Sequence, residues 1–401
     1  MEGLNRRAAV LFIFVTVVLD VLALGIIAPV LPPLVIEFLG GDTVRAARVY
    51  GIFATAWAFM QFIASPILGS LSDRFGRRPI ILLSVTGLGL DYIFMALAPS
   101  LGWLFVGRMI SGVTSAGFAT AAAYIADVTP PEQRAKSFGM IGAAFGLGFV
   151  LGPALGGLLG TVNPRLPFWA SAALCLTNAL YGLFVLPESL PPERRSHFSW
   201  KRANPVGSLR LLRSHPELFA LASVTFLYYV AHEVLPSTFV LYTDYRYGWN
   251  PQSVGLTLAL VGVCTAIVSG TLIGPIVKKI GERRAALLGL TCGATAFATF
   301  GLAPTGKLFL IGIPIMAFAS VYSPSAQGIM TRRVLPTEQG QLQGAMMGLR
   351  GLSGLISPGM FTFTFATAIS SRADLHLPGA PFLLAGSLIV VALVIAHRAT
   401  K

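Results

Sequence analysis

The chain has 401 residues, of which 55% are hydrophobic and only 11% are charged, and it contains 43 glycines. Soluble domains carry about 25% charged residues, so this composition excludes an ordinary soluble enzyme and indicates an integral membrane protein built from closely packed helices. The formal net charge of +13 would by itself also fit a nucleic-acid-binding protein, so the placement of the basic residues has to decide between the two classes.

Apolar stretches of about 20 residues recur along the whole chain, separated by short polar loops. They predict twelve membrane-spanning helices near residues 8–31, 49–70, 79–98, 102–126, 138–160, 167–186, 217–242, 251–277, 284–303, 308–331, 341–368 and 379–397. Of the 29 Lys and Arg residues, 21 fall on the side of the N-terminus and six on the other side. By the positive-inside rule both termini are cytoplasmic, which explains the net charge without a nucleic-acid partner.

The two halves of the sequence repeat one another at a constant offset. The segment GSLSDRFGRRP begins at Gly69, and the similar segment GPIVKKIGERR begins 205 positions later, at Gly274. The Gly-Pro pair at 152–153 and the Ser-Pro pair at 357–358 are again 205 positions apart. Matches at one offset indicate an internal duplication, the arrangement that lets transporters rock two halves about a site at the midplane.

This duplication defines the predicted domain organisation. We expect an all-α integral membrane fold with two pseudo-symmetric six-helix bundles, residues 1–186 and 217–401. The stretch 187–216 is rich in Pro, Arg and Ser, which is typical of a cytoplasmic linker.

The loop after the second predicted helix carries a pattern of glycines and charges. Its members are Gly69, Asp73, Arg74, Gly76, Arg77 and Arg78. The first glycine lets a helix end approach a neighbour, the second permits a tight turn, and the charges can bond helix termini and carboxylates. The pattern resembles the signature of the major facilitator superfamily, which implies a cytoplasmic gate between the halves with Asp127 as its acidic partner.

The fifth predicted helix carries small residues four positions apart. These are Gly148, Gly152, Pro153, Gly156 and Gly157. Small residues at this spacing allow backbone contact between membrane helices, and a proline opens the hydrogen-bond ladder and kinks the helix. The motif resembles the one that marks drug/proton antiporters within the superfamily.

Three ionisable residues lie inside the predicted helices of the first half. Asp20 is near the midplane of the first helix, where a lone carboxylate costs about 3 kcal/mol unless it is protonated, paired or hydrated. At about 1.5 Å per residue in a core of about 30 Å, Asp91 and Arg108 reach similar depths, which favours an ion pair. We therefore expect Asp20 and Asp91 to be proton sites. The stretch around Arg108 resembles a superfamily pattern whose buried arginine is linked to proton transfer, which implies that Arg108 takes part in proton coupling. Asp20 and Arg108 are also expected to contact the substrate.

The second half has its own intramembrane ionisable residues, His232, Glu233 and Arg350. Histidine titrates near neutrality and a glutamate can load and release a proton, so both are candidates for proton coupling and substrate binding. Arg350 could hold Glu233 ionised or meet an anionic group of a substrate. Because neighbouring residues on a helix point about 100° apart, His232 and Glu233 cannot both face the same place.

No motif of a soluble catalyst is present in the sequence. It has no phosphate-binding Walker loop, no GxSxG elbow, no HExxH and no paired-cysteine spacing. We therefore expect no enzyme activity, no cofactor and no metal, with the proton gradient as the source of energy.

Taken over nearly all twelve helices, the chain resembles the tetracycline-efflux branch of the drug/proton antiporters. The resemblance rests on stretches such as VLDVLALGIIAPVLPPL, GRMISGVTSAGFATAAAYIAD, FGLGFVLGPALGG and KKIGERRAALLG. It implies the major facilitator fold, a monomer in the bacterial inner membrane, and exchange of an amphiphilic drug for a proton by alternating access. Asp20, Asp91 and Arg108 match functional positions of the family.

The second half departs from this pattern. Thr265 and Gly293 occupy places where drug-resistance members carry a histidine and an aspartate, while Glu233 and Arg350 are additional charges. The substrate therefore stays open between tetracycline or a related drug and an endogenous, possibly anionic, metabolite carried with or without protons. A membrane sensor that does not transport is a further class, which the repeat and the gate motif argue against.

Overall fold

The computed structural model describes residues 2–115, 117–129, 134–196, 216–335, 338–370 and 376–399, and within these ranges the fold is helical without strands. The helices are α1 (Glu2–Ile27), α2 (Leu31–Phe38), α3 (Thr43–Phe75), α4 (Arg77–Ala96), α5 (Leu101–Thr114), α6 (Gly117–Val128), α7 (Arg134–Val162), α8 (Leu166–Val185), the 3-10 turn η2 (Pro192–Arg194), α10 (Pro216–His232), α11 (Val234–Tyr247), α12 (Pro251–Ile267), the π-helical turn η4 (Val268–Leu272), α13 (Ile273–Leu302), α14 (Gly306–Ala319), α15 (Tyr322–Thr331), α16 (Gln339–Ala368) and α17 (Ala380–Ala399).

Each of the twelve predicted membrane-spanning stretches falls on one to three of these helices, which confirms the predicted fold class. In the described part of the chain, nine stretches are long and apolar enough to cross a membrane. One of them, Pro251–Leu302, has 52 residues and holds two predicted spans joined end to end. The joint between them is Gly281, whose φ of 79° interrupts the helical backbone inside α13.

Prolines explain where two of the spans are broken into separate helices. Pro236 has no N–H to donate to the carbonyl of His232, and its ring crowds that carbonyl, so α10 ends at His232 and α11 begins at Val234. Pro324 stands in the same relation to Ser320, where α14 gives way to α15. The first break leaves Glu233 between two helices, in the middle of a span.

The chain folds as two compact units, and each unit draws on separate stretches of sequence. The first unit contains residues 1–38, 56–205 and 250–259, and the second contains residues 39–55, 206–249 and 260–401. The start of α3 thus belongs to the second unit and the start of α12 to the first. The predicted linker, 187–216, is described only as far as residue 196 and at its last residue, so its role as a linker stays a prediction.

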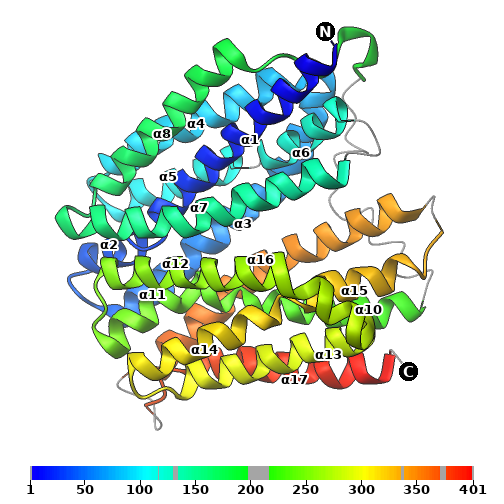
Figure 1. The fold of residues 1–401 in the computed structure, drawn as a ribbon. Coiled ribbons are helices and arrows are strands. Elements are labelled where there is room, and N and C mark those ends of the chain that lie inside the picture. Colours follow the sequence, from blue (N-terminus) through cyan, green and yellow to red (C-terminus); the bar gives the residue numbers. More distant parts are fainter. Residues whose placement is uncertain are drawn as a thin grey trace. The chain divides into compact units, whose positions relative to one another are not determined.

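In the first unit α1 is the central helix. It packs against α7, α8 and α6, and Figure 1 shows α1 running alongside α7. Helix α4 packs against α8, α5 and α6, so the unit is a bundle in which α1 and α4 are both surrounded by other helices.

In the second unit α13 packs against α17, α14 and α15, while α10 packs against α17 and α16. Its core contains a cluster of aromatic rings in which the fully buried Tyr242 contacts Phe309, Phe365 and Phe382. The hydroxyl of Tyr242 donates to the carbonyl of Phe300 at 2.9 Å. A buried phenol with a satisfied hydroxyl stabilises a helix interface without an unpaired polar atom.

Candidate functional site

Asp20 lies at the contact between α1 and α8. The side-chain amide of Asn178 on α8 donates to the Asp20 Oδ1 at 3.0 Å and to the carbonyl oxygen of Thr16 at 3.0 Å. Asn178 is 1% exposed, and its own Oδ1 has no hydrogen-bond partner among the described residues. The sequence had shown only Asp20; the partner Asn178 lies in an apolar helix and gave no signal of this contact.

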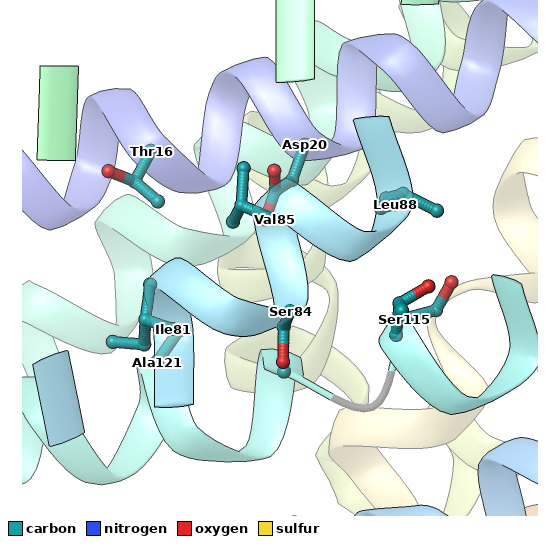
Figure 2. Close-up of a pocket in the computed structure, with 10 residues that line it drawn as sticks. Thr16, Asp20, Ile81, Ser84, Val85, Leu88, Ser115 and Ala121 are labelled. Atoms are coloured by element: carbon teal, nitrogen blue, oxygen red, sulfur yellow. The ribbon is translucent and has the colours of Figure 1, made fainter. Parts of the chain in front are cut away.

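A small cavity adjoins Asp20 on the side of α1 that faces α4, as Figure 2 shows. Its volume is about 20 Å³. Its lining combines the Asp20 carboxylate with hydroxyl side chains and apolar groups: Thr16, Ile81, Ser84, Val85, Leu88, Thr114, Ser115, Gly117 and Ala121. Drug-sized ligands occupy pockets of about 300–1,000 Å³, so this cavity is not a drug-binding pocket.

Asp91 on α4 and Arg108 on α5 form the second ionisable group of the first unit. Asp91 is 2% exposed and Arg108 is 9% exposed, and the two charges lie within electrostatic reach of each other. Neither carboxylate oxygen of Asp91 has a hydrogen-bond partner in the described residues. The guanidinium of Arg108 lies 5.2 Å from the ring centroid of Trp57, a cation–π contact. The structure therefore brings together the two charges that the sequence placed at similar depth.

In the second unit, His232 and Glu233 face different neighbours, as their helical spacing predicts. The His232 ring lies 4.0 Å from the Tyr228 ring and 5.4 Å from the Phe297 ring, so it is part of an aromatic packing cluster. Its Nδ1 is 3.0 Å from the carbonyl oxygen of Tyr228. Glu233 instead lies within electrostatic reach of Arg350 on α16.

Arg350 is an exposed cation in α16, on the membrane-spanning stretch that the sequence predicts at 341–368. Its guanidinium lies 5.9 Å from the ring centroid of Tyr229 on α10. Tyr229 is held in turn by a side-chain hydrogen bond with Ser323 on α15. Among the described residues, Arg350 has no ion pair shorter than 4.0 Å.

The loop between α3 and α4 has the geometry expected for its charged residues. Gly76 has a φ of 105°, which L residues rarely adopt, and forms the turn between the helices. Arg77 pairs with Asp73 at 2.6 Å and with Asp127 at 3.0 Å. Its Nη1 also donates to the Ser72 hydroxyl at 2.6 Å. Arg77 thus connects this loop to the end of α6.

Three other loop residues behave differently. A Cβ at Gly69 would meet no atom within 4 Å, so the expected close approach at this glycine is not found. The backbone carbonyl of Gly69 accepts a hydrogen bond from the Ser72 hydroxyl at 2.7 Å. The guanidinium of Arg74 lies over the ring of Phe75, and Arg78 donates to the carbonyl of Leu183 on α8.

Glu188 is a residue of this loop region that the sequence did not single out. Its carboxylate accepts from the backbone N–H groups of Arg77 at 2.8 Å and Leu190 at 3.0 Å. It therefore caps the start of α4, where a negative charge is favoured by the helix dipole. Ser196 also donates its N–H to the Asp73 carbonyl at 3.0 Å, so hydrogen bonds at both ends connect residues 188–196 to the loop. An acidic residue just after an apolar span was the available signal.

The small residues of α7 lie against two helices. A Cβ at Gly148 or Gly152 would come within 3 Å of the α1 backbone, and Gly25 is the matching small residue on α1. Gly156 faces the backbone of Ile26. Gly157 is on another face, where its neighbours are the first residues of α12. Helix α7 continues through Pro153.

Metal binding finds no support in the ranges that the structure describes. There, no three His, Cys, Asp or Glu side chains gather as they would around a metal ion.

A two-unit helical bundle with an internal repeat and buried charges inside its spans defines a membrane transporter. The sequence profile of the Major Facilitator Superfamily matches residues 13–358 and, separately, 221–399. The class C tetracycline resistance protein of Escherichia coli is 36% identical over 92% of this chain and 92% of its own length. The class D tetracycline resistance protein of Salmonella ordonez is 34% identical over 97% of both chains.

The chain therefore belongs to the Major Facilitator Superfamily and, within it, to the family of the tetracycline resistance proteins. The crystal structure of the nucleoside transporter NupG has the same fold, with a TM-score of 0.77 and 15% identity over 98% of this chain and 99% of that one. The protein is a multi-pass inner-membrane transporter of a small molecule, not an enzyme.

Proposed function

We propose that the protein is a proton-coupled efflux antiporter, which exports an amphiphilic drug such as tetracycline, or a related small molecule, by alternating access. In this proposal both termini are cytoplasmic, the protein works as a monomer within the lipid bilayer, and the proton gradient supplies the energy without a cofactor. The 69–78 loop with Asp127 acts as the cytoplasmic gate.

The observation that carries the proposal is Asp20, a carboxylate inside a span that is held by one amide and adjoins a polar cavity. A carboxylate at that depth is stable when protonated and becomes stable as an anion only when it is paired or hydrated. It can therefore change its protonation as its surroundings change. Asp91 and Arg108 lie in the same unit, which supports a proton route there.

The departures in the second unit bear on the substrate. A Cβ at Gly293 would meet Ala319 at 3.5 Å and Ile389 at 3.8 Å, so this position is inside apolar packing between helices. A carboxylate there would be buried without a partner. Glu233 and Arg350 are the charges that the sequence places inside the predicted spans of this unit, and this supports a substrate contact made by these two residues rather than by positions 265 and 293.

The proposal is tested by drug-driven proton exchange in everted membrane vesicles. We expect that neutralising the three candidate carriers together, in Asp20→Asn with Asp91→Asn and Glu233→Gln, abolishes exchange. Glu37→Gln, which neutralises an exposed carboxylate on α2, is the matched control and should retain it. Unchanged exchange in the triple variant would overturn the mechanism.

A second candidate function, a carrier of an endogenous anion, is favoured by one observation. Arg350 presents an exposed guanidinium above an aromatic ring in the middle of a span, an arrangement that suits a planar carboxylate or phosphate. Counterflow of an anionic compound that persists without a pH gradient, with no drug protection in an efflux-deficient host, would favour this function. Loss of counterflow on collapsing the gradient would exclude it.

A further inference from the structure

Three hydroxyl groups beside Asp20 are buried without hydrogen-bond partners in the described part of the chain. Thr16 on α1 is 3% exposed, Ser84 on α4 is 5% exposed, and Ser115 at the end of α5 is 4% exposed. None of their hydroxyl oxygens has a partner among the described residues. All three side chains line the cavity that adjoins Asp20 (Figure 2). Unpaired buried hydroxyls cost free energy, and three of them around one cavity require a common explanation.

The fourth hydroxyl of the same cavity provides the contrast. Thr114 also lines it, but its Oγ1 donates to the carbonyl oxygens of Ile110 at 3.1 Å and Ser111 at 3.2 Å. A hydroxyl on a helix can therefore satisfy itself on its own backbone, and Thr114 does so. Thr16, Ser84 and Ser115 do not, although they too are on helices or at a helix end.

The size of the cavity fits one water molecule. A cavity of about 10–15 Å³ or more holds a water when the water has two to four polar partners. This cavity has a volume of about 20 Å³ and offers a carboxylate and three unpaired hydroxyls. A larger ligand is excluded by the volume of the cavity.

We propose that this cavity binds water, which hydrogen-bonds the Asp20 carboxyl and unpaired hydroxyls among those of Thr16, Ser84 and Ser115, and that Asp20 exchanges its proton through this water. When Asp20 releases its proton, the carboxyl O–H bond breaks and the water oxygen takes the proton. The water then gives one of its other protons to solvent water, so it is regenerated. The hydroxyls position the water, and its part in transport rests on the function proposed above.

Few other titratable groups act on Asp20. Cys175 on α8 and Tyr92 on α4 are within electrostatic reach of it, and Tyr92 is also within reach of Asp91. A thiol and a phenol are neutral near pH 7, so the carboxyl is the member of this set that changes charge there. In the described parts of α6 and α7, no further titratable group acts on Asp20.

The experiment is infrared difference spectroscopy of the purified protein across a pH step, combined with proton exchange in liposomes. The band of the protonated Asp20 carboxyl is assigned by its loss in Asp20→Asn. We expect Thr16→Val, Ser84→Ala and Ser115→Ala each to shift this band and to slow proton exchange about fivefold. Thr16→Ser, which keeps the hydroxyl, should behave like the unmodified protein.

Thr114→Val is the matched control, because it removes a hydroxyl from the same cavity that is already satisfied by the backbone. It should leave the band and the exchange rate unchanged. An unshifted band in the three variants, or an equal shift in Thr114→Val, would overturn the bound water. If Asp20→Asn retains full exchange, Asp20 is not the proton carrier of the proposed function, while the band position in the unmodified protein still decides whether the water is present.

Discussion

The two units share a backbone plan but differ in the charges placed on it. Gly76 in the first unit and Gly281 in the second are 205 positions apart, and both have positive φ at the joint between two spans. The residue after each glycine pairs with a residue at the end of a later helix, Arg77 with Asp127 and Glu282 with Arg332. These partners are again 205 positions apart, and the charges are reversed.

The two units therefore keep a glycine turn between two spans and a salt bridge that begins one residue after it, while the charges of the paired residues differ. Positive φ is a requirement of the turn and is met by glycine in both copies. A salt bridge between two helix ends requires opposite charges but not a particular order of them. Deeper in the spans the copies differ further, because the first unit has Asp20 beside a polar cavity and the second has the exposed Arg350 above an aromatic ring.

The largest effect should distinguish the carboxylates of the two units. If the first unit carries the proton, Asp20→Asn lowers drug-driven proton exchange by about 100-fold or more. Glu233→Gln should mainly change the apparent KM for the substrate, by about tenfold or less, because Glu233 lies next to Arg350. Both are measured in reconstituted liposomes over a range of drug concentrations. Equal losses of proton exchange in the two variants would contradict the assignment of proton transfer to Asp20 and substrate binding to Glu233.

Close packing of α7 against α1 gives the next largest effect. Gly152→Ala places a Cβ 2.8 Å from the Cα of Gly25 and 2.9 Å from the Leu22 carbonyl oxygen, so the helices must separate. We expect a loss of about 1–3 kcal/mol in the free energy of unfolding, seen as a lower melting temperature in detergent. Gly146→Ala, on the same helix with no atom within 4 Å, is the control and should melt like the unmodified protein.

The salt bridges Arg77–Asp127 and Glu282–Arg332 should differ in their contribution to stability because they differ in burial. The Arg77 side chain is 11% exposed, whereas the Arg332 side chain is 71% exposed. Arg77→Gln should therefore lower the free energy of unfolding by about 2 kcal/mol, and Arg332→Gln by less than about 0.5 kcal/mol. Exchanging both charges, in Arg77→Asp with Asp127→Arg, should recover part of the first loss. A larger effect at Arg332 than at Arg77 would contradict this account.

The smallest effect concerns the carboxylate cap at the start of α4. Glu188→Ala removes this cap and should lower the free energy of unfolding by about 1 kcal/mol. Glu193→Ala, at an exposed position in η2, removes the same charge from the chain without touching α4. Chemical denaturation of the two variants side by side measures the difference, and identical curves would show that the cap is not stabilising.

The sequence was sufficient for the spans and for the repeat, because twenty consecutive apolar residues and a constant offset are strong signals. It also indicated that Arg77 would meet carboxylates, through the spacing of its loop. It could not show that α10 ends at His232, although Pro236 explains this once the helices are seen. The close approach predicted at Gly69 stays a prediction, because a Cβ there would meet no atom within 4 Å among the described residues.

The polar surroundings of Asp20 could not be predicted at all. Asn178, Ser84 and Ser115 are ordinary small polar residues in apolar helices, and nothing in their local sequence separates them from Thr114. Their importance arises from tertiary packing, which brings several helices to one point. A single sequence contains no record of that packing, whereas a charge at membrane depth is visible because of its cost.

The most direct test of the central claim, that the first unit exchanges a proton at Asp20 for the drug, is proton release from the purified protein on titration with tetracycline. We expect that drug binding at neutral pH releases about one proton per molecule of tetracycline bound, and that Asp20→Asn binds the drug without releasing a proton. Full proton release from Asp20→Asn, or drug binding by the unmodified protein without any release, would contradict it.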